Sequence, residues 1–373
     1  MRILIAPNAF KNSLNAFDAS KCIELGLQRS LLDCDTEIVP LADGGDDTLD
    51  ILLRILGGQR QEAVVQDPLG RNIKCQYGIN GEQAFIEMAS ASGLRLMDSG
   101  EYDPLRASTF GTGQLIMQAI RQGAREIVIG IGGSGTVDGG TGMLAAMGAK
   151  FYDNNGNEIS NDNPLITLDR IDFHKVVENC KGIKFTILCD VENPLLGPTG
   201  AAHIFGPQKG ATESDVIALE QAMMKFSEIV SDWNGTDHSK TEGSGAAGGL
   251  GFALLTVLNG QMVGGAGYII EASNFKEKLL KSDLVITGEG KLDSQSVGGK
   301  APFMVAKLAN ELGKPCIALA GKIEDHEQLY DFFTSMFPIV NGPISLDEAI
   351  SNANQNMIIA AQQLGNTLSI NRD

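Results

Sequence analysis

Residues 285–302, VITGEGKLDSQSVGGKAP, place charged and hydroxyl side chains directly after an apolar strand. These side chains are Glu289, Lys291, Asp293, Ser294 and Lys300. In open α/β sheets, ligands bind beyond the carboxyl ends of strands, and helix N-termini accept anions. The segment therefore predicts a ligand-binding site that can accept an anion. Carboxylates and serines also cap helices, so a purely structural role is the alternative.

A second strand-to-helix passage, IVIGIGGSGTVDGGTGMLAAMGA, contains Ser134, Thr136 and Asp138. Its glycines would let backbone N–H groups cradle a phosphate or a carboxylate. The loop is neither a Walker A motif nor the glycine loop of protein kinases. Close packing of a helix on a strand explains the glycines equally well, and both explanations stay open.

Two charged segments follow the first two expected strands. APNAFKNSL carries Lys11 and Ser13, and LADGGDDT carries Asp43, Asp46 and Asp47. Neighbouring strand ends in a parallel sheet face the same crevice. A lysine opposite carboxylates suits a site where Mg²⁺ neutralises a transferring phosphoryl group. For Asp46 and Asp47, capping of a helix is nearly as good an explanation.

The run LCDVENPLLGPTGAAHIFGPQKGAT places Asp190 immediately after a strand expected at 185–189. An aspartate there can accept the proton of a substrate hydroxyl or hold a magnesium ion. Further along the run, Gln208 and Lys209 are candidate nucleotide contacts, and His203 is interpreted as a loop histidine. The histidines show no HxxxH or HExxH spacing, which disfavours a zinc site.

Two further segments offer contacts to a substrate. FIEMASASGL places Glu87 at the end of a strand, and PLRASTFGTGQLI carries Arg106, Ser108 and Thr109 before a helix. Arg106 or the helix N-terminus could bind a substrate carboxylate. A plain helix-capping role for Thr109 is the competing account.

Strands and helices alternate at both ends of the chain, which favours a parallel sheet. Strands are expected at 2–6, 36–40, 283–287 and 316–320 and near Phe337, with helices at 17–29, 300–312 and 346–364. The segments 63–65, 75–79 and 84–88 instead predict short antiparallel strands, because the turn signals DPLG and NG separate them. A helix at 113–122 and a strand at 126–130 follow.

The predicted fold class is therefore α/β with two domains. A doubly wound parallel-sheet domain is formed by both chain ends, residues 1–65 and 275–373, and a large second α/β domain, residues 66–274, is inserted into it.

Composition narrows the functional class. The net charge of −17 over 373 residues repels nucleic acid and anionic membranes alike, so we expect neither as a partner. The six cysteines contain no CxxC pair, which fits a reducing compartment, and the N-terminus does not look like a signal peptide. We expect a soluble cytoplasmic protein, and a homo-oligomer is compatible with the sequence.

Eight ordered segments resemble the type 1 glycerate kinase family over nearly the whole chain. They are APNAFKNSL, LADGG, FIEMASASGL, STFGTG, IGIGGSGTVDGG, CDVENPLLGPTGAAHIFGPQKGA, GAAGGLG and TGEGKLDSQSVGGK. The resemblance implies a discontinuous flavodoxin-like (Rossmann-like) domain with an inserted α/β domain. It also implies ATP-dependent phosphorylation of D-glycerate, mostly at the 2-hydroxyl. Two departures are Asp47, where ADGGEGT-like sequences carry Gly, and Val137, where GSATNDGG-like sequences carry Asn.

With that resemblance, the candidate residues take hypothetical roles for ATP, Mg²⁺ and D-glycerate. The catalytic group is Asp190 as the base, with Lys11 and Lys300 to neutralise phosphoryl charge. Nucleotide contacts are predicted at Ser134, Gly288, Glu289, Gly290, Ser294, Gln208 and Lys209. Substrate contacts are predicted at Ser13, Arg106, Ser108 and Thr109. Metal contacts are predicted at Asp43, Glu289 and Asp293.

Three other functions compete with this hypothesis. A kinase for another small hydroxy acid would share the same residues, because a small difference in a pocket cannot be read from one sequence. A sensor that binds a metabolite and a nucleotide without turnover is the non-enzymatic alternative. A dinucleotide-dependent dehydrogenase is disfavoured, because the first strand leads into APNAFK and not into GxGxxG.

Overall fold

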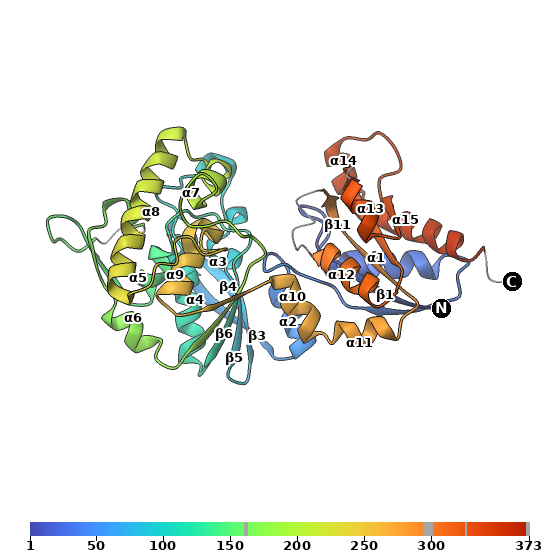
Figure 1. Cartoon of the computed structure of the whole chain (residues 1–373), viewed down its shortest axis with the longest axis horizontal. Coiled ribbons are helices and arrows are strands. Elements are labelled where there is room, and N and C mark those ends of the chain that lie inside the picture. Colours follow the sequence, from blue (N-terminus) through green and yellow to red (C-terminus); the bar gives the residue numbers. More distant parts are fainter. Residues whose placement is uncertain (160–162, 294–300, 325–326, 371–373) are drawn as a thin grey trace. The chain divides into compact units, whose positions relative to one another are not determined.

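The computed structural model describes residues 1–159, 163–293, 301–324 and 327–370, which form two compact units (Figure 1). The discontinuous unit combines Met1–Asp43 with Ala266–Asp373 and is drawn in blue and in orange to red. The inserted unit is Gly44–Gly265. The discontinuous unit is thus formed by both ends of the chain, and the inserted unit is continuous in sequence.

The boundaries differ from the predicted ones at 65 and 275. Strand β3 (Gln59–Gln66) pairs antiparallel with β4 (Asn72–Asn80), so its backbone hydrogen bonds place it in the sheet of the inserted unit. At the second crossing, the chain leaves the inserted unit at Gly265, the first residue of helix α10 (Gly265–Ala272). The compact units therefore place residues 44–65 in the inserted unit and residues 266–274 in the discontinuous unit.

The discontinuous unit contains a five-stranded sheet in the order β13-β12-β11-β1-β2, and its strand pairs are all parallel. Numbered within this unit and read from β2, the order is 2-1-3-4-5. The strands are β1 (Arg2–Pro7), β2 (Asp35–Ile38), β11 (Leu284–Leu292), β12 (Cys316–Ile323) and β13 (Ser335–Pro338). Its remaining helices are α1 (Ala16–Gln28), α11 (Phe275–Leu280), α12 (Ala301–Glu311), α13 (Glu327–Phe332), α14 (Leu346–Ser351) and α15 (Ala353–Leu368).

Helices α1 and α15 come from opposite ends of the chain and pack closely. Gly26 makes this possible, because a Cβ there would lie 2.4 Å from the carbonyl oxygen of Ile358. Apolar residues of both helices, such as Leu27 and Met357, join the sheet residue Ile3 in one buried core. The single helix predicted at 346–364 is two helices, α14 and α15, with Asn352 between them.

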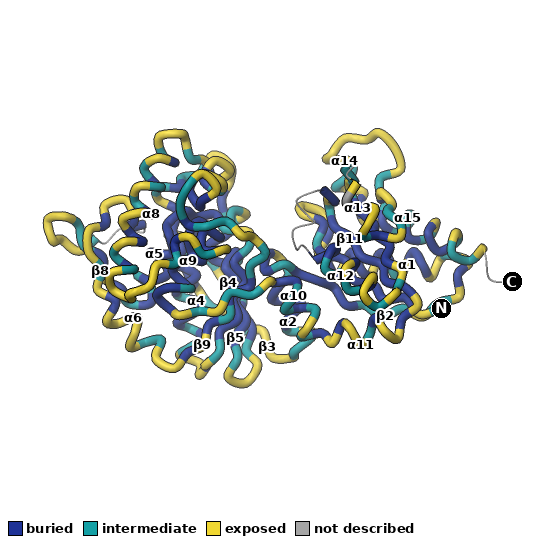
Figure 2. The backbone as a smooth tube through the Cα atoms, in the orientation of Figure 1, coloured by how far each residue is buried: buried dark blue, intermediate teal, exposed yellow. Residues whose placement is uncertain are grey.

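The inserted unit contains a six-stranded mixed sheet in the order β10-β9-β6-β5-β4-β3. The β3–β4 and β4–β5 pairs are antiparallel, as predicted, and the others are parallel. The remaining strands of this sheet are β5 (Gln83–Glu87), β6 (Glu126–Gly130), β9 (Lys184–Leu188) and β10 (Gln261–Val263). Strands β7 (Lys150–Tyr152) and β8 (Arg170–Asp172) pair antiparallel in a separate two-stranded sheet. Figure 2 shows β4 and β5 running through the buried part of this unit.

Helices surround this sheet and complete the core of the inserted unit. They are α2 (Thr48–Leu56), α3 (Ala89–Ser92), α4 (Phe110–Arg121), α5 (Thr141–Ala146), α6 (His174–Asn179), α7 (Ala201–Phe205), α8 (Glu213–Asn234) and α9 (Leu250–Thr256). Short 3₁₀ helices are η1 (Leu94–Leu96), η2 (Ser99–Glu101), η3 (Leu165–Thr167), η4 (Pro207–Lys209) and η5 (Ala246–Gly249). No helix in the described ranges is both long and apolar enough to cross a bilayer.

Candidate active site

In the discontinuous unit, the segment after β1 lies against the end of β11. The backbone N–H of Asn8 donates to the carbonyl of Gly288 at 2.8 Å. A Cβ added at Gly290 would lie 3.5 Å from the backbone nitrogen of Lys11, whose side chain is exposed. The backbone of Lys11 therefore lies close to the 288–290 segment.

The residues Glu289 to Lys291 lie on strand β11 and not in the loop that was predicted after residue 287. The strand continues because β12 pairs with it as far as Leu292. Gly288 is required by this pairing, since a Cβ there would lie 2.0 Å from the carbonyl oxygen of Leu319. Strand pairing thus requires a glycine at position 288, apart from the predicted role of Gly288 in nucleotide binding.

Two carboxylates at the end of β11, Glu289 and Asp293, are buried. Lys291 lies 3.0 Å from Asp293 and 3.0 Å from Glu324, and these two neighbours raise the pKa of its amino group. Asp43 follows β2 and is half-buried. Since β11, β1 and β2 are adjacent and parallel, all these groups lie at the end of the sheet where the strands have their carboxyl termini.

The predicted metal set does not form a tight carboxylate cluster. Among residues 1–159, 163–293, 301–324 and 327–370, no group of three or more His, Cys, Asp or Glu side chains is placed to hold a metal ion. Ser13 is exposed and donates to the carbonyl of Ile350 at 3.4 Å, so it faces α14. The predicted residues Ser294 and Lys300 lie outside the described residues.

In the inserted unit, the glycine-rich loop after β6 is held by backbone hydrogen bonds to the α3–η1 segment. The N–H of Leu94 donates to the carbonyl of Gly133 at 3.0 Å, and the N–H of Gly135 donates to Ser92 at 2.8 Å. Ser134 lies between these bonds and is partly exposed. The loop therefore has a defined conformation with Ser134 at its surface.

Arg95, on η1, forms an ion-pair cluster that the sequence did not predict. Its guanidinium donates to Glu87 at 3.0 Å and to Asp46 by a shorter contact. Glu87 is buried at the end of β5, and burial raises its pKa to about 7, although Arg95 opposes this shift. Half-exposed Arg95 thus lies beside the glycine-rich loop.

Asp138 organises the far side of the same loop. Its fully buried carboxylate accepts bonds from Thr109 through N at 2.8 Å and Oγ1 at 2.7 Å, and from the N–H groups of Gly140 at 3.0 Å and Gly142 at 3.1 Å. Burial raises the pKa of Asp138, and these four bonds oppose the shift. The hydroxyl of Thr109 is also the acceptor for the N–H of Met143 at 2.8 Å. Asp138 therefore ties α4 to α5.

Consequently, two of the predicted substrate contacts serve the local structure. Thr109 and Ser108 are buried, and the hydroxyl of Ser108 accepts from the N–H of Phe110 at 3.2 Å. For Thr109, these bonds agree with the alternative of a structural role at the start of α4. Arg106, three residues earlier than Thr109, is exposed.

Lys209 and Gln208 are neighbours with opposite environments on η4. Gln208 is exposed, whereas Lys209 is 1% exposed. The Lys209 ammonium donates to Ser134 Oγ at 2.7 Å and to the carbonyl of Thr136 at 2.6 Å. Lys209 was a candidate nucleotide contact, but its amino group is buried and bonded to the protein.

Asp190 follows β9 and lies at the start of α10. Its Oδ1 accepts from the N–H of Gly265 at 2.7 Å, and a Cβ added at Gly264 would lie 3.2 Å from that oxygen. The carboxylate is half-buried. Its position at a strand end agrees with the prediction.

The departure at position 47 places a non-glycine residue in an unfavourable backbone conformation. Asp47 has a φ of 70°, which is the left-handed region that glycine adopts readily. Val137, the other departure, is fully buried. The glycine and asparagine of the family pattern would thus occupy a left-handed turn and an interior position.

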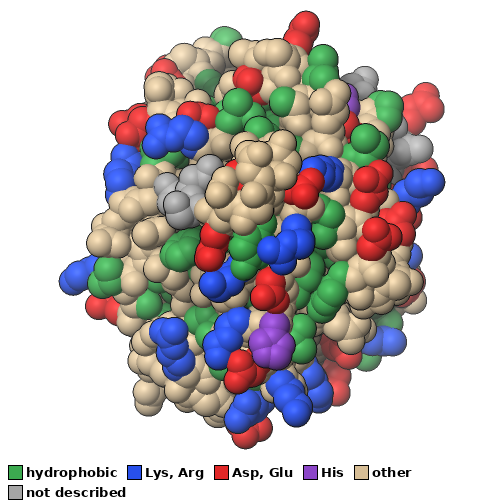
Figure 3. All heavy atoms as spheres, turned by 90° about the vertical axis from the view of Figure 1, so that its left-hand side faces the viewer, with side chains coloured by type: hydrophobic (Ala, Val, Ile, Leu, Met, Phe, Trp, Pro, Cys, Tyr) green, Lys and Arg blue, Asp and Glu red, His purple; other side chains and the backbone are tan. Residues whose placement is uncertain are grey.

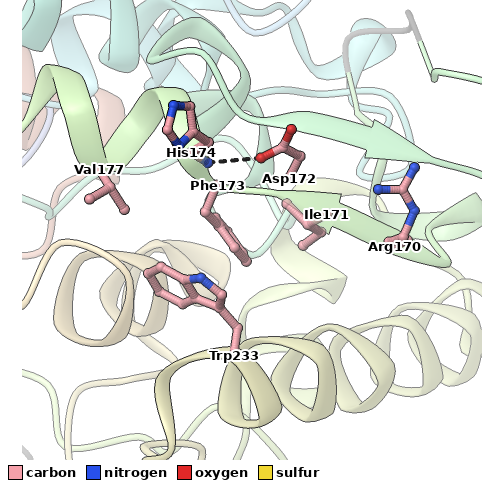
Figure 4. A pocket seen from close by; sticks show the side chains of 7 residues that line it. All are labelled: Arg170, Ile171, Asp172, Phe173, His174, Val177 and Trp233. Carbon is pink, nitrogen blue, oxygen red and sulfur yellow. Dashed lines mark hydrogen bonds between the residues drawn. The ribbon is translucent and has the colours of Figure 1, made fainter.

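A separate cavity of about 480 Å³ lies on the inserted unit, around β8 and α6 (Figure 4). The ring of Phe173 lies 4.5 Å from that of Trp233, and the N–H of His174 donates to Asp172 at 2.9 Å. None of the seven residues drawn is a predicted site residue. On the face shown in Figure 3, acidic and basic side chains are intermixed. The cavity is therefore lined by none of the predicted strand-end residues.

Comparisons with known proteins agree with one another. Residues 3–369 match the Glycerate kinase family model. The chain is 40% identical over 378 residues to the glycerate 2-kinase of Escherichia coli (strain K12), covering 99% of this chain and 98% of that protein. It is 39% identical over 375 residues to the glycerate kinase of Halalkalibacterium halodurans, covering 99% of each. A crystal structure provisionally named glycerate kinase 2, from Salmonella typhimurium LT2, superposes with a TM-score of 0.83 at 37% identity, covering 99% of this chain and 98% of that one.

These matches extend over both units and include the strand-end segments that carry Lys11, Ser134, Asp190 and Glu289. The chain belongs to the glycerate kinase family.

Proposed function

We propose that this protein catalyses the ATP-dependent phosphorylation of D-glycerate to 2-phosphoglycerate. The observation that carries the proposal is the family match over residues 3–369, together with curated glycerate kinases of about 40% identity along the whole chain. The polar groups at the strand ends of both sheets support it, because phosphoryl transfer needs positioned charges more than covalent chemistry. The strand order 2-1-3-4-5 further supports a flavodoxin-like discontinuous unit.

In the inserted unit, Asp190 orients the substrate hydroxyl and accepts its proton. Its half-buried carboxylate, already anchored by the N–H of Gly265, supports this role. Ser134 and Gln208 bind anionic oxygens of the ligands, and exposed Arg106 remains a candidate for the substrate carboxylate.

In the discontinuous unit, Lys11 and Lys300 neutralise charge on the transferred phosphoryl group, and Gly290 and Ser294 lie against the nucleotide. Mg²⁺ is commonly bound by one or two protein carboxylates together with substrate phosphates. Asp43, Glu289 and Asp293 fit that donor set, although they do not form a three-carboxylate cluster. When bound, Mg²⁺ would offset the charge of the phosphates.

Phosphorus NMR of the product made from D-glycerate, ATP and Mg²⁺ tests the proposal. We expect one phosphomonoester signal, with coupling to the single proton on C2. Coupling to two protons would indicate the 3-hydroxyl. Turnover only with another hydroxy acid, or binding without ADP release, would replace the proposal with the other kinase or with a sensor. A cytoplasmic location belongs to the same proposal, supported by six free cysteines.

A further inference from the structure

Lys209 is a buried ammonium whose hydrogen bonds go to one loop. It lies on η4, and its two acceptors, Ser134 Oγ and the carbonyl of Thr136, both lie in the glycine-rich loop after β6. A lysine ammonium has three N–H donors and no acceptor. In the bond to Lys209, Ser134 must therefore be the acceptor, and its own O–H remains available to donate elsewhere.

The exposed side of this loop can receive an anion. Gly133 is exposed and Ser134 is partly exposed. Within the described part of the chain, neither of their backbone N–H groups donates a hydrogen bond to the protein. Gly133 has a φ of 74°, and consecutive N–H groups around a left-handed residue form a concave anion site. The loop thus offers two N–H donors and one O–H donor to an oxyanion.

We propose that Lys209 is a positioning residue whose charged amino group holds the Ser134 hydroxyl as a donor to an anionic oxygen of a ligand, and that loss of its proton releases that hydroxyl. The oxyanion is either the carboxylate of the hydroxy acid or a phosphate of the nucleotide. The identity of the ligand rests on the proposed function, but the Lys209–Ser134 relationship does not.

The surroundings of Lys209 make its charge sensitive to pH. Burial lowers its pKa to about 7, and the negative charge of Asp138 opposes this shift. Other charged or aromatic groups lie around η4 and its loop. On α7, the ring centre of Phe205 lies 5.8 Å from Nζ of Lys209, and His203 lies 3.6 Å from Glu220 on α8. Tyr102 lies against Gly210, and Arg95 lies beside Gly133 with its partners Asp46 and Glu87.

The direction of the pH effect follows from these groups. Below pH 7 Lys209 is charged and Ser134 must accept, so its O–H points to the ligand. Above pH 7 the neutral amine can itself accept the Ser134 O–H. An anion that binds only the first arrangement binds more weakly as pH rises, with a limiting slope of about tenfold per pH unit. The bound anion in turn raises the pKa of Lys209.

The kinetic test uses Ser134→Ala, because Lys209→Met would leave Asp138 as an uncompensated buried charge and could prevent folding. KM for D-glycerate, KM for ATP and kcat are measured from pH 6 to 9 for the wild type, Ser134→Ala and the control Ser227→Ala. The Ser227 hydroxyl donates within α8 to the carbonyl of Met224. In the wild type and the control, one KM should rise above pH 7. In Ser134→Ala that KM should be raised about three- to tenfold at pH 6.5, and its rise with pH should disappear.

The KM that responds identifies the oxyanion: D-glycerate for the carboxylate, ATP for the phosphate. The titration of the nucleotide itself cancels in the comparison of variants. A pH dependence in Ser134→Ala equal to that of the wild type overturns the proposal.

A second measurement does not depend on turnover. In protein labelled with ¹³C and ¹⁵N lysine, one amino group should titrate near pH 7, and ADP or D-glycerate should raise its pKa in the wild type but not in Ser134→Ala. The resonance of this amino group is assigned to Lys209 if it is absent in Lys209→Arg. If that variant does not fold, a shift of the resonance in Ser134→Ala gives the assignment. Absence of any lysine that titrates below pH 9 overturns the proposal. A wild type without kinase activity refutes the proposed function alone, since the titration can still be read.

Discussion

Arg95 donates a hydrogen bond of 3.0 Å to Glu87, a carboxylate buried at the end of β5. Even with this partner, burial raises the pKa of Glu87 to about 7. A carboxyl group with a raised pKa binds more protons in the folded than in the unfolded state between its two pKa values. The contribution of Glu87 to stability is therefore fully present below about pH 4.5 and is lost as pH rises to about 7.

Glu87→Gln should remove this pH dependence. The amide oxygen can still accept from Arg95, but it carries no charge to desolvate. Relative to the wild type, the variant should gain about 3 kcal/mol in free energy of unfolding between pH 4.5 and 7. Urea denaturation across this range measures the difference, and Glu82→Gln, at an exposed glutamate of the β4–β5 turn, is the control. A constant difference between Glu87→Gln and the wild type would contradict the raised pKa.

Asp190→Asn should abolish most of the turnover without disturbing the fold. The asparagine oxygen can keep the bond to the N–H of Gly265, but it cannot accept a proton from the substrate. We expect kcat to fall about 10²- to 10⁴-fold with nearly unchanged ATP binding. Steady-state kinetics and calorimetric titration with a nucleotide test this. Asp169→Asn, at a surface ion pair with Lys225, is the matched control. Unchanged kcat would remove Asp190 from the mechanism.

Asp138→Ala should destabilise the inserted unit severely, although this residue need not contact a ligand. The substitution leaves four buried donors without an acceptor and removes the negative charge near Lys209. The expected loss is about 3–5 kcal/mol in the free energy of unfolding. Urea denaturation measures it, and Asp232→Ala on the exposed side of α8 should change stability by less than about 0.5 kcal/mol. Similar values for the two variants would refute this assignment.

Two glycines of β11 should respond differently to the same substitution. In Gly288→Ala the new methyl would lie 2.0 Å from the carbonyl oxygen of Leu319, and we expect a loss of about 1–3 kcal/mol or more. In Gly290→Ala the nearest atom is Lys11 N at 3.5 Å, an ordinary contact. That variant should fold normally and, if Gly290 lies against the nucleotide, raise KM for ATP. Thermal denaturation and kinetics of the pair separate the two roles.

The rhythm of strands and helices was sufficient to predict the parallel sheet of the discontinuous unit and the antiparallel strands after it. The predicted boundaries differ from those of the compact units, because the sequence of β3 does not show that its partner is β4. The end of β11 was also missed. Glycines at 288 and 290 suggest a loop, whereas β12 keeps this segment in the sheet.

The strand-end positions of Lys11 and Asp190 were predicted, since each residue comes shortly after a strand. Arg95 was missed because it lies on a 3₁₀ turn, which has no periodic signal, and reaches the loop only through the pairing of Leu94 with Gly133. Lys209 was identified, but its buried amino group bonds to Ser134, 75 positions away. Long-range contacts of this kind leave no local trace in one sequence.

The discontinuous unit also sets the order in which the protein can fold during synthesis. Thr287 donates to the carbonyl of Ala6, 281 positions earlier, so β1 lacks its central neighbour β11 until most of the chain has left the ribosome. The packing partner of helix α1, helix α15, is synthesised even later than β11. The inserted unit, complete at Gly265, can collapse first. Nascent chains should therefore expose the apolar N-terminal strand to chaperones until translation ends.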